Sequence, residues 1–416
     1  AILRKTGANQ TTEQARIYGK AVRYFADIDG PVFPMELPFD SLRSGPVHLN
    51  VQFDEPMLPD DSDKWLDEIV ISAKAFESRT KPTTLKSDAN RGVLIIGHDR
   101  AGLSLESVRK FAKELGWPII AEDPLSFPDA VAHASIFLTS AQIRAALIPQ
   151  TVIVIGRTTL SRSINAFSKL APTQVVIDPR MATVDSDRQA DKRFTQLPVL
   201  NTHKASPEWL DQWDKYSLRC AKNVDGLTGF TEAVIAKEIA ANLPEGSTLF
   251  VSSSRPIRDL EGFATPRSGV TTHANRGLAG IDGNISTALG IALASKQTFA
   301  VLGDLSFLHD LTGLIHREEI NCTFIVINND GGGIFSTLPQ RGVDGFETVF
   351  GTPHGLDPAA IAKAMGISAT TISSIDELKK TLKAAVEGIS IVVANVPSRD
   401  ENADSLKAIY ESMNSI

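Results

Sequence analysis

The chain has 416 residues, of which 42% are hydrophobic and 22% are charged, and its formal net charge at pH 7 is −7. This length predicts two or three domains rather than a single hydrophobic core. The net negative charge gives no indication of a basic surface that would bind nucleic acid. No apolar run approaches the roughly 18 residues that a membrane-spanning helix requires, so we expect no membrane insertion.

Residues 1–60 read as the C-terminal remnant of a domain. A helix is predicted around residues 12–27 and a strand over residues 47–53, after which prolines and an acidic cluster mark a domain exit. Residues 61–91 are polar and charged, which is typical of a linker that crosses a surface.

Residues 92–205 alternate between strand-like and helix-like stretches. Strands are predicted at residues 92–97, 118–121, 151–156 and 174–178, and helices at residues 103–115 and 141–147. This alternation indicates an α/β fold with a doubly wound parallel sheet, which would be the central domain. The polar stretch 181–215 has weak periodicity and is predicted to be a second linker. The cysteines Cys220 and Cys322 are expected to be buried, reduced thiols, which fits a cytoplasmic enzyme.

Residues 206–416 repeat the alternation and predict a second parallel sheet. Strands are predicted at residues 248–251, 298–302, 322–327 and 389–396, and helices at residues 286–295 and 307–319. Ser374 and Glu377 form a capping box that opens a helix with Leu378, Leu382 and Val386 on one face. That helix is expected to be scaffold.

Two polar segments follow predicted strands of this last region. Gly303 and Asp304 come directly after one strand, and Asn329 follows the next, twenty-five positions after Asp304. Ligands bind outside the carboxyl ends of parallel strands, where a hard cation can take carboxylate, amide and carbonyl oxygens together with those of a diphosphate. The spacing therefore predicts a magnesium-diphosphate site. Taken singly, Asp304 could cap a helix and Asn329 could belong to an ordinary turn.

Longer motifs around this spacing make the pattern specific. They lie at residues 274–283, 303–310 and 328–340. Together they resemble the family of 2-succinyl-5-enolpyruvyl-6-hydroxy-3-cyclohexene-1-carboxylate (SEPHCHC) synthases of menaquinone biosynthesis, which are thiamine-diphosphate enzymes. The resemblance extends over nearly the whole chain and is weakest between about residues 62 and 200. It implies a partial pyrimidine-binding domain, a central domain and, over residues 206–416, a domain that binds diphosphate and metal.

The resemblance also implies a cofactor site. Thiamine diphosphate would be bound by Gly303, Asp304, Ser306, Ser254, Ile281, Asn329 and Gly331. Among these, Asp304, the Asn329 side chain and the Gly331 carbonyl would hold Mg²⁺ or Mn²⁺. Ile281 would prop the thiazolium ring of the cofactor against its pyrimidine ring, although it could simply be core, and Ser306 could instead be a helix cap.

The family's substrates, 2-oxoglutarate and isochorismate, carry several carboxylates. The resemblance implies that Arg258 and Arg276 bind them with planar guanidinium groups, and that Asn9 and Gln10 reach the same active site. The remaining residues of the predicted substrate pocket are Arg162, Ile334, Phe335 and Leu338. Other interpretations stay open, because exposed arginines are usually solvated, Asn9 and Gln10 could form a polar turn, and an apolar run is more often plain core.

Compared with the family, this sequence is expected to contain only the last portion of the pyrimidine-binding domain and to lack the glutamate that activates the cofactor. The chain alone is therefore expected not to turn over, and the family implies a homodimer or homotetramer. Two alternatives remain. Another thiamine-diphosphate decarboxylase or acetohydroxyacid synthase would share the metal motif without needing Arg258 and Arg276, and a non-catalytic remnant would bind the cofactor only.

Overall fold

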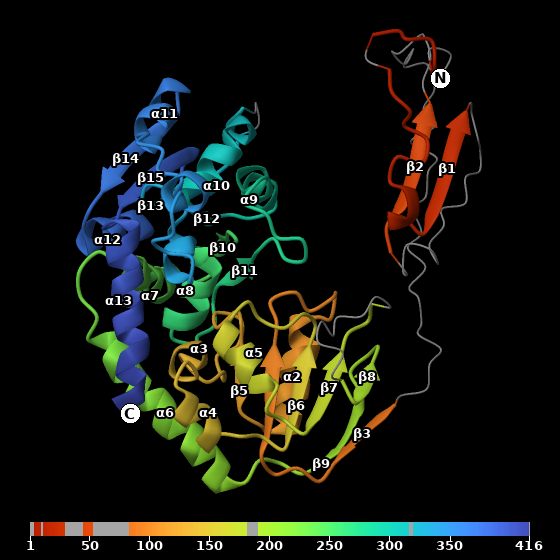
Figure 1. Cartoon of the computed structure of the whole chain (residues 1–416), viewed down its shortest axis with the longest axis vertical. Helices are drawn as coiled ribbons and strands as arrows, with labels where there is room; N and C mark the ends of the chain where they lie inside the picture. Colours follow the sequence, from red (N-terminus) through yellow and green to blue (C-terminus); the bar gives the residue numbers. More distant parts are fainter. Residues whose placement is uncertain are drawn as a thin grey trace. The chain divides into compact units, whose positions relative to one another are not determined.

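The computed structural model describes residues 4–9, 11–29, 45–52, 83–180, 190–315 and 319–415. The chain divides into two compact units. Unit 1 comprises Ala1–Thr83 with Arg180–Ser186, and unit 2 comprises Thr84–Pro179 with Asp187–Ile416. Figure 1 labels the elements of both units along the chain. None of the helices in the described ranges is long and apolar enough to cross a membrane.

Unit 1 contains a two-stranded parallel sheet. The strand β1 (Tyr24–Asp29) pairs with β2 (Val47–Gln52), and a short 3₁₀ helix, η1 (Gly19–Ala21), precedes β1. The strand predicted at residues 47–53 is confirmed as far as Gln52, but the helix predicted over residues 12–27 is wrong. Gly19 has a positive φ of 49°, which interrupts an α-helix, and aromatic and β-branched residues of β1 gain ladder hydrogen bonds by pairing with β2.

The first sheet of unit 2 has five parallel strands in the order β5-β4-β6-β7-β8. Its strands are β4 (Gly92–Ile96), β5 (Ile119–Ala121), β6 (Thr151–Ile155), β7 (Thr173–Ile177) and β8 (Lys192–Phe194). The helices in this part are α2 (Leu105–Leu115), α3 (Ala134–Phe137), α4 (Ala141–Ala146) and α5 (Arg162–Ser168). The four predicted strands and both predicted helices are confirmed. Every residue of β4 and β6 is buried, as expected for strands covered on both faces.

Both segments predicted to be linkers contain regular structure. β3 (Thr84–Ser87) pairs with β9 (Val199–Thr202), and α6 (Pro207–Asp225) begins before the second linker was expected to end. One face of α6 is buried through Trp209, Trp213, Cys220 and Val224. Both indoles pack into the core beneath the first sheet. The linker prediction failed here because the polar residues between these buried side chains obscured the helical period. Residues 61–82 and 181–189 lie outside the described residues.

The second sheet of unit 2 has six parallel strands in the order β11-β10-β12-β13-β15-β14. Its strands are β10 (Thr248–Val251), β11 (Thr271–His273), β12 (Thr298–Gly303), β13 (Cys322–Asn328), β14 (Ser368–Ile372) and β15 (Ile389–Asn395). The helices that accompany it are α7 (Glu232–Asn242), α8 (Arg255–Phe263), α9 (Asn284–Ala292), α10 (Asp304–His309), α11 (Pro358–Ala364), α12 (Ile375–Lys383) and α13 (Arg399–Ser412). The four predicted strands are confirmed, whereas the edge strands β11 and β14 were not predicted.

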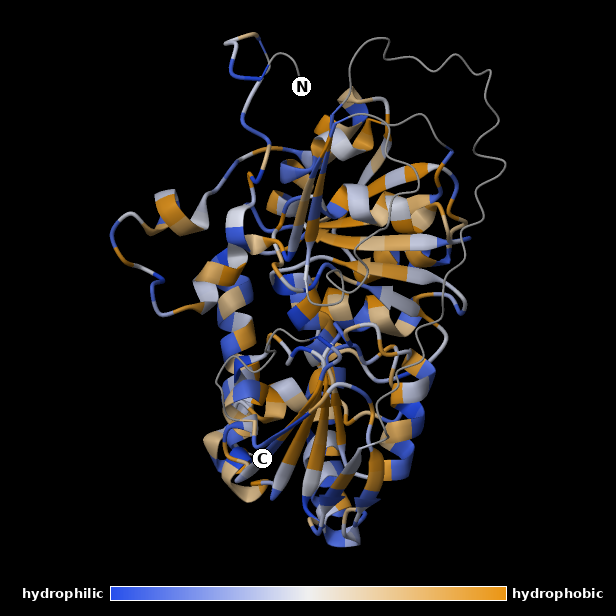
Figure 2. Cartoon of the chain, turned by 90° about the vertical axis from the view of Figure 1, so that its right-hand side faces the viewer, coloured by the Kyte–Doolittle hydropathy of each residue, from blue (hydrophilic) through white to orange (hydrophobic). Residues whose placement is uncertain are grey.

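Alternate residues of each strand enter cores on opposite faces of this sheet. In β12, Phe299 and Val301 pack with side chains of α7, α8 and α12, whereas Ala300 and Leu302 pack with side chains of α9, α10 and α11. Figure 1 shows these helices around the sheet, and Figure 2 shows the hydrophobic strands of both sheets between mixed-polarity helices. The doubly wound α/β fold is therefore confirmed. Cys220 and Cys322 are both free and buried.

The helix predicted over residues 307–319 is wrong in both position and length. α10 starts at Asp304 and ends at His309, and a 3₁₀ turn, η3 (Leu311–Leu314), follows it. Asp310 is the C-cap of α10, with φ −124° and ψ 27°, and its carboxylate accepts hydrogen bonds from the backbone nitrogen and the hydroxyl of Ser286, at 2.7 Å and 3.1 Å. Residues 316–318 lie outside the described residues. By contrast, the Ser374 cap is confirmed: its side chain accepts from the Glu377 nitrogen at the start of α12.

Candidate active site

A cavity lies where the connections of the second sheet change direction. β10 and β12 are neighbours, yet the chain continues from β10 to β11 on one side and from β12 to β13 on the other. Open α/β sheets bind ligands outside the carboxyl ends of such strands. Residues that follow β10, Ser253 and Ser254, and residues at the end of β12, Gly303 and Asp304, line a cavity of about 350 Å³. We call this the cofactor cavity.

The cofactor cavity brings together all seven residues for which the sequence predicted cofactor binding. They are Ser254, Ile281, Gly303, Asp304, Ser306, Asn329 and Gly331. Ser306 has a further task, since its hydroxyl donates to the Ile281 carbonyl at 2.9 Å and accepts from Asn284 Nδ2 at 2.9 Å. A hydroxyl has a single hydrogen to donate. Ser306 donates it to the Ile281 carbonyl, so its side chain holds the backbone at Ile281 in place.

Asp304 organises the loop that follows β13. It is 2% exposed, and its Oδ2 atom accepts from the backbone nitrogens of Asn329 and Gly331 at 3.2 Å and 2.9 Å. His354 Nε2 lies 3.3 Å from the same oxygen. Burial raises the pKa of Asp304, and these hydrogen bonds oppose the shift. The two segments predicted to meet at the metal site are therefore joined directly.

Asn329 presents an unsatisfied oxygen at this site. Its Nδ2 atom donates to Glu232 Oε1 at 2.5 Å, whereas its Oδ1 atom is buried without a hydrogen-bond partner among the described residues. A buried acceptor without a partner is costly, and a hard cation would satisfy it. Asn329 Oδ1, the Asp304 carboxylate and the Gly331 carbonyl are all oxygen atoms, the type of ligand that Mg²⁺ prefers, so the predicted metal ligands stay a prediction that the chemistry of these groups suits. The part of the chain that the structure describes contains no cluster of three or more His, Cys, Asp or Glu residues that could hold a metal.

The loop after β13 contains the predicted metal ligands Asn329 and Gly331, and we call residues 329–333 the metal loop. Three consecutive glycines allow it to pack against the segment that includes η5 (Glu347–Gly351). A Cβ atom at Gly331 would lie 2.2 Å from the Gly351 carbonyl oxygen, and one at Gly332 would lie 2.2 Å from that of Phe350. A Cβ atom at Gly333 would lie 2.3 Å from Asn329 Nδ2. These distances are far below any real Cβ contact, so the Gly331–Gly333 run is required by close packing as well as by the φ of +131° at Gly331.

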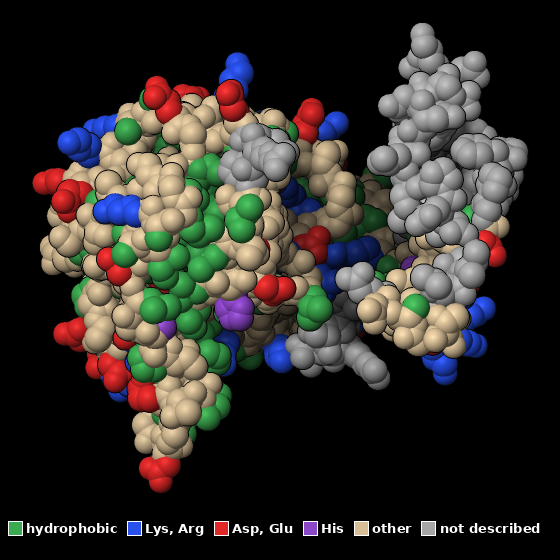
Figure 3. Space-filling model, turned by 90° about the horizontal axis from the view of Figure 1, so that it is seen from above, with side chains coloured by type: hydrophobic (Ala, Val, Ile, Leu, Met, Phe, Trp, Pro, Cys, Tyr) green, Lys and Arg blue, Asp and Glu red, His purple; other side chains and the backbone are tan. Residues whose placement is uncertain are grey.

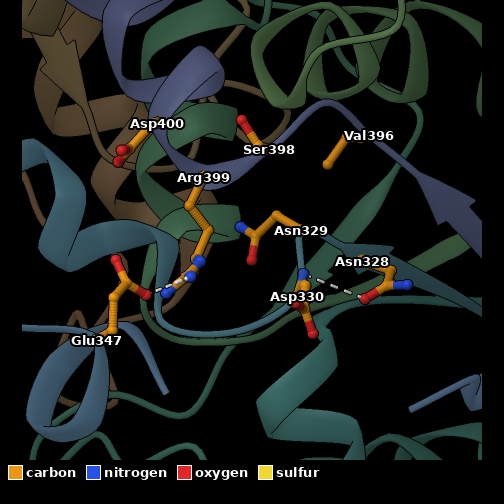
Figure 4. Close-up of a pocket in the computed structure, with 8 residues that line it drawn as sticks. All are labelled: Asn328, Asn329, Asp330, Glu347, Val396, Ser398, Arg399 and Asp400. Atoms are coloured by element: carbon orange, nitrogen blue, oxygen red, sulfur yellow. Dashed lines mark hydrogen bonds and ion pairs between the residues drawn. The ribbon is translucent and has the colours of Figure 1, made fainter. Parts of the chain in front are cut away.

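A polar cavity of about 260 Å³ borders the same loop (Figure 4). In it, Arg399 Nη2 donates to Glu347 Oε2 at 2.6 Å, which ties the start of α13 to η5. Asn329 lines both this cavity and the cofactor cavity. The metal loop is thus supported by Asp304 from within the cofactor cavity and by η5, which Arg399 anchors.

A further cavity of about 350 Å³ adjoins the cofactor cavity, sharing Arg255 and Ile334 with it. Its lining includes Arg162, Arg258, Ile334 and Leu338, which are four of the six residues predicted for the substrate pocket. The Arg258 guanidinium donates from Nη1 to the Ser254 carbonyl at 2.6 Å. We call this the arginine cavity. Phe335 lines the cofactor cavity instead.

Comparisons with known proteins agree with this geometry. The family model described as the middle domain of thiamine pyrophosphate enzymes matches residues 59–251, and the C-terminal thiamine-pyrophosphate-binding domain matches residues 259–396. A SEPHCHC synthase of Thermobifida fusca is 34% identical over 99% of this chain and 80% of its own length. The SEPHCHC synthases of Lysinibacillus sphaericus and a Nocardioides species are 31% and 34% identical, over 99% and 97% of this chain and 80% and 77% of their own lengths. The chain belongs to the SEPHCHC synthase family.

Membership in this family confirms the resemblance drawn from the motifs and makes the chain a thiamine-diphosphate enzyme of the transferase class. Asp304, Asn329 and Gly331 all fall within the match to the C-terminal thiamine-pyrophosphate-binding domain. The individual roles of these residues stay predictions.

Three residues predicted for the active site lie elsewhere or cannot be placed. Arg276 is not among the residues that line the two cavities. Its guanidinium, 6% exposed, pairs with Glu122, the shortest contact being 2.7 Å from Nη2 to Oε1. Asn9 belongs to unit 1 and Gln10 lies outside the described residues. The roles proposed for Asn9 and Gln10 therefore stay predictions.

The equivalent position of the first sheet is closed. Its connections change direction between β4 and β6, but a Cβ atom at Gly97 would lie 1.6 Å from the Arg157 carbonyl oxygen, and one at Gly156 would lie 2.0 Å from that of Asp99. The Arg157 side chain also pairs with Asp99 at 3.0 Å. Within the described residues, these two loops therefore touch at the place where the second sheet has its crevice.

Sequence reasoning missed a buried group of charges beside the cofactor cavity. Arg255 Nε lies 3.6 Å from Glu232 Oε2, and Arg255 also forms an ion pair with Asp259. Burial raises the pKa of Glu232, and raises that of Asp259 to about 7, while the positive charge of Arg255 opposes both shifts. Glu232 follows the cap residue Thr231, so its sequence context suggests only an acidic residue placed to stabilise a helix N-terminus.

Proposed function

We propose that the protein is a SEPHCHC synthase that uses thiamine diphosphate and Mg²⁺, or Mn²⁺, to decarboxylate 2-oxoglutarate and to add the remaining succinyl-semialdehyde unit to isochorismate in a 1,4-addition. The product would be SEPHCHC, with release of carbon dioxide, in menaquinone biosynthesis. The observation that carries this proposal is the cofactor cavity, which is lined by the buried Asp304 and by Asn329, whose Oδ1 atom has no hydrogen-bond partner among the described residues. The names of the relatives support the choice of reaction.

In this proposal, Asp304, Asn329 Oδ1 and the Gly331 carbonyl hold the metal, and Gly303 lets the backbone approach the diphosphate. Thiamine diphosphate supplies a carbon nucleophile and an electron sink for decarboxylation. Ile281 offers an apolar surface to the cofactor, at a position fixed by the hydrogen bond from Ser306.

Two arginines of the arginine cavity would recognise the substrate carboxylates. Arg162 and Arg258 both line it, and guanidinium groups bind carboxylates through two parallel hydrogen bonds. Glu261 also lines it, but burial raises the pKa of its carboxyl group well above the usual range, so the neutral form is favoured and repels an anion less. Ile334, Phe335 and Leu338 would provide apolar walls. Arg276 stays a proposed substrate residue, with Glu122 holding its guanidinium in place.

The test is to incubate the protein, together with a glutamate-bearing pyrimidine-binding domain, with 2-oxoglutarate, isochorismate, thiamine diphosphate and Mg²⁺, and to identify the product by mass spectrometry while measuring carbon dioxide. Formation of SEPHCHC is the expected result. Product formed from pyruvate instead would favour an acetohydroxyacid synthase. Cofactor binding without any turnover by the protein together with a glutamate-bearing pyrimidine domain would favour a remnant that only binds the cofactor.

We also propose that the protein acts in the cytoplasm as a homodimer or homotetramer. Figure 3 shows hydrophobic side chains gathered on one face of unit 2, and Leu278, three residues before Ile281, is fully exposed. Contiguous exposed apolar surface is typical of an interface. Light scattering coupled to size-exclusion chromatography would measure the assembly, and a monomer at micromolar concentration would refute this part of the proposal.

A further inference from the structure

The side-chain amide of Asn329 can serve a metal in only one of its two orientations. An amide carries an oxygen that accepts and a nitrogen that donates, and the two ends have nearly the same shape. Rotation by half a turn would therefore place an N–H group where a cation requires an oxygen. Something must select the orientation in which Oδ1 is free.

Glu232 is the group that contacts the other end of this amide. Its Oε1 atom lies 2.5 Å from Asn329 Nδ2, while Asn329 Oδ1 has no hydrogen-bond partner within the described ranges. A carboxylate only accepts hydrogen bonds, so it attracts the nitrogen of the amide and repels the oxygen. The contact thus favours one orientation on electrostatic grounds as well as by shape.

Glu232 is held by contacts of its backbone and its carboxylate with two further helices. Glu232 is the first residue of α7, and its backbone nitrogen donates to Asn402 Oδ1 of α13 at 3.1 Å. Its Oε2 atom lies 3.6 Å from Arg255 Nε, at the start of α8. Glu232 is 6% exposed, so water has little access to this contact. A rigid, buried acceptor can hold the amide before any metal arrives.

Charge balance explains why this acceptor is paired with an arginine. Asp304 lies close enough for its charge to disfavour ionisation of Glu232, and a second unbalanced carboxylate next to a buried ligand is costly. Arg255, which is 13% exposed in its side chain, provides the compensating positive charge. Arg255 also pairs with Asp259, so it offsets part of the negative charge that the acceptor for Asn329 brings to the site.

We infer that Glu232 is a positioning residue that orients the Asn329 amide so that Oδ1 faces the metal. This inference rests on the proposed metal site and extends it by assigning a task to a residue that does not itself touch the metal. It predicts that the energetic effect of Glu232 depends on what stands at position 329. An aspartate there would present an oxygen in either orientation and would need no such partner.

The test is a double-mutant cycle read out by metal affinity. Mn²⁺ binding in the presence of thiamine diphosphate is measured by electron paramagnetic resonance for the wild-type protein, Glu232→Ala, Asn329→Asp and the double variant. Glu232→Ala should weaken Mn²⁺ binding about 10- to 100-fold with Asn329 in place, as is common when a partner of a ligand is removed. In the Asn329→Asp background the same change should leave affinity unchanged or raise it, because it removes a repelling carboxylate.

Glu232→Gln is the matched control. Its amide oxygen can still accept from Asn329 Nδ2, so Mn²⁺ affinity should stay within about threefold of wild type, and the variant also remains informative if Glu232→Ala does not fold. A loss for Glu232→Gln as large as that for Glu232→Ala would overturn the inference, since charge rather than orientation would then matter. An equal loss from Glu232→Ala in both backgrounds would also overturn it, because that pattern indicates a general structural role. Absence of Mn²⁺ binding in the wild type would instead refute the proposed site, and the inference with it.

Discussion

Gly332→Ala should distort the metal loop by a purely steric route. The backbone of Gly332 has φ −79° and ψ 59°, the conformation of an inverse γ-turn, which residues with a side chain also adopt, so the main effect of the substitution is steric. The added Cβ atom, however, would lie 2.2 Å from the Phe350 carbonyl oxygen, where ordinary contact begins at 3.4 Å. The loop and η5 must therefore separate by roughly 1.2 Å, the difference between these two distances.

The cost follows from the contacts that oppose this separation. Overpacking in a close-packed region costs about 1–3 kcal/mol. The hydrogen bond from the Gly332 nitrogen to the Gly351 oxygen, 2.8 Å long, would be strained as well, which adds about 1 kcal/mol. We therefore expect a destabilisation of roughly 2–4 kcal/mol. The same loop carries Asn329 and Gly331. A loss of about 2 kcal/mol in the free energy of cofactor binding corresponds to an affinity for thiamine diphosphate with Mg²⁺ that is about 30-fold lower.

Urea-induced unfolding followed by fluorescence measures the stability, and isothermal titration calorimetry measures the affinity. The matched control is Gly290→Ala in α9, where a Cβ atom would meet nothing within 4 Å. That change should stabilise the protein by about 0.5–1 kcal/mol, because alanine suits a helix interior better than glycine, and it should leave cofactor affinity unchanged. The reasoning would be refuted if Gly332→Ala unfolded at the wild-type urea concentration and bound the cofactor as tightly as wild type.

Three further predictions concern the site. Asp304→Ala and Asn329→Ala should each abolish Mg²⁺-dependent binding of thiamine diphosphate, and unchanged affinity in calorimetry would remove both from the metal site. Arg258→Ala and Arg276→Ala should spare cofactor binding but lower kcat/KM for the carboxylate substrates about 10- to 150-fold, the equivalent of losing about 1.5–3 kcal/mol of charge-assisted hydrogen bonding; wild-type kinetics would exclude them. The folded-state pKa of Glu261 is raised, so the stability it contributes is complete below its unfolded pKa of about 4.3 and is lost as the pH rises through the folded pKa. Glu261→Gln should therefore have a higher melting temperature than wild type, and the difference should grow as the pH rises from about 4.3 through the folded-state pKa. A difference in melting temperature that does not change with pH in calorimetry would contradict this.

The elements that the sequence predicted correctly share a local origin. The strand runs at residues 298–302 and 322–327 are short and apolar because both faces of the sheet are covered, and that pattern is visible without any tertiary contact. The same locality explains the errors. At residues 12–27, β1 pairs with β2 in place of the predicted helix, and at residues 307–319 the helix ends at His309, where the next residue, Asp310, contacts Ser286. Neither partner can be read from the segment itself.

The sequence alone determined the doubly wound α/β class and the residues at the ends of β12 and β13, because strand periodicity and the position of a polar residue after a strand are properties of neighbouring residues. It also placed all seven cofactor-binding candidates, through motifs that the cofactor cavity then brought together. The tertiary structure alone decided which partners these side chains have. The contact of Asn329 with Glu232 joins residues 97 positions apart, and that of Arg276 with Glu122 joins residues 154 positions apart. Such contacts form only when the helices and sheets pack. Packing excludes water from both partners, and the interaction between a buried charge and its partner is strong only where water is excluded.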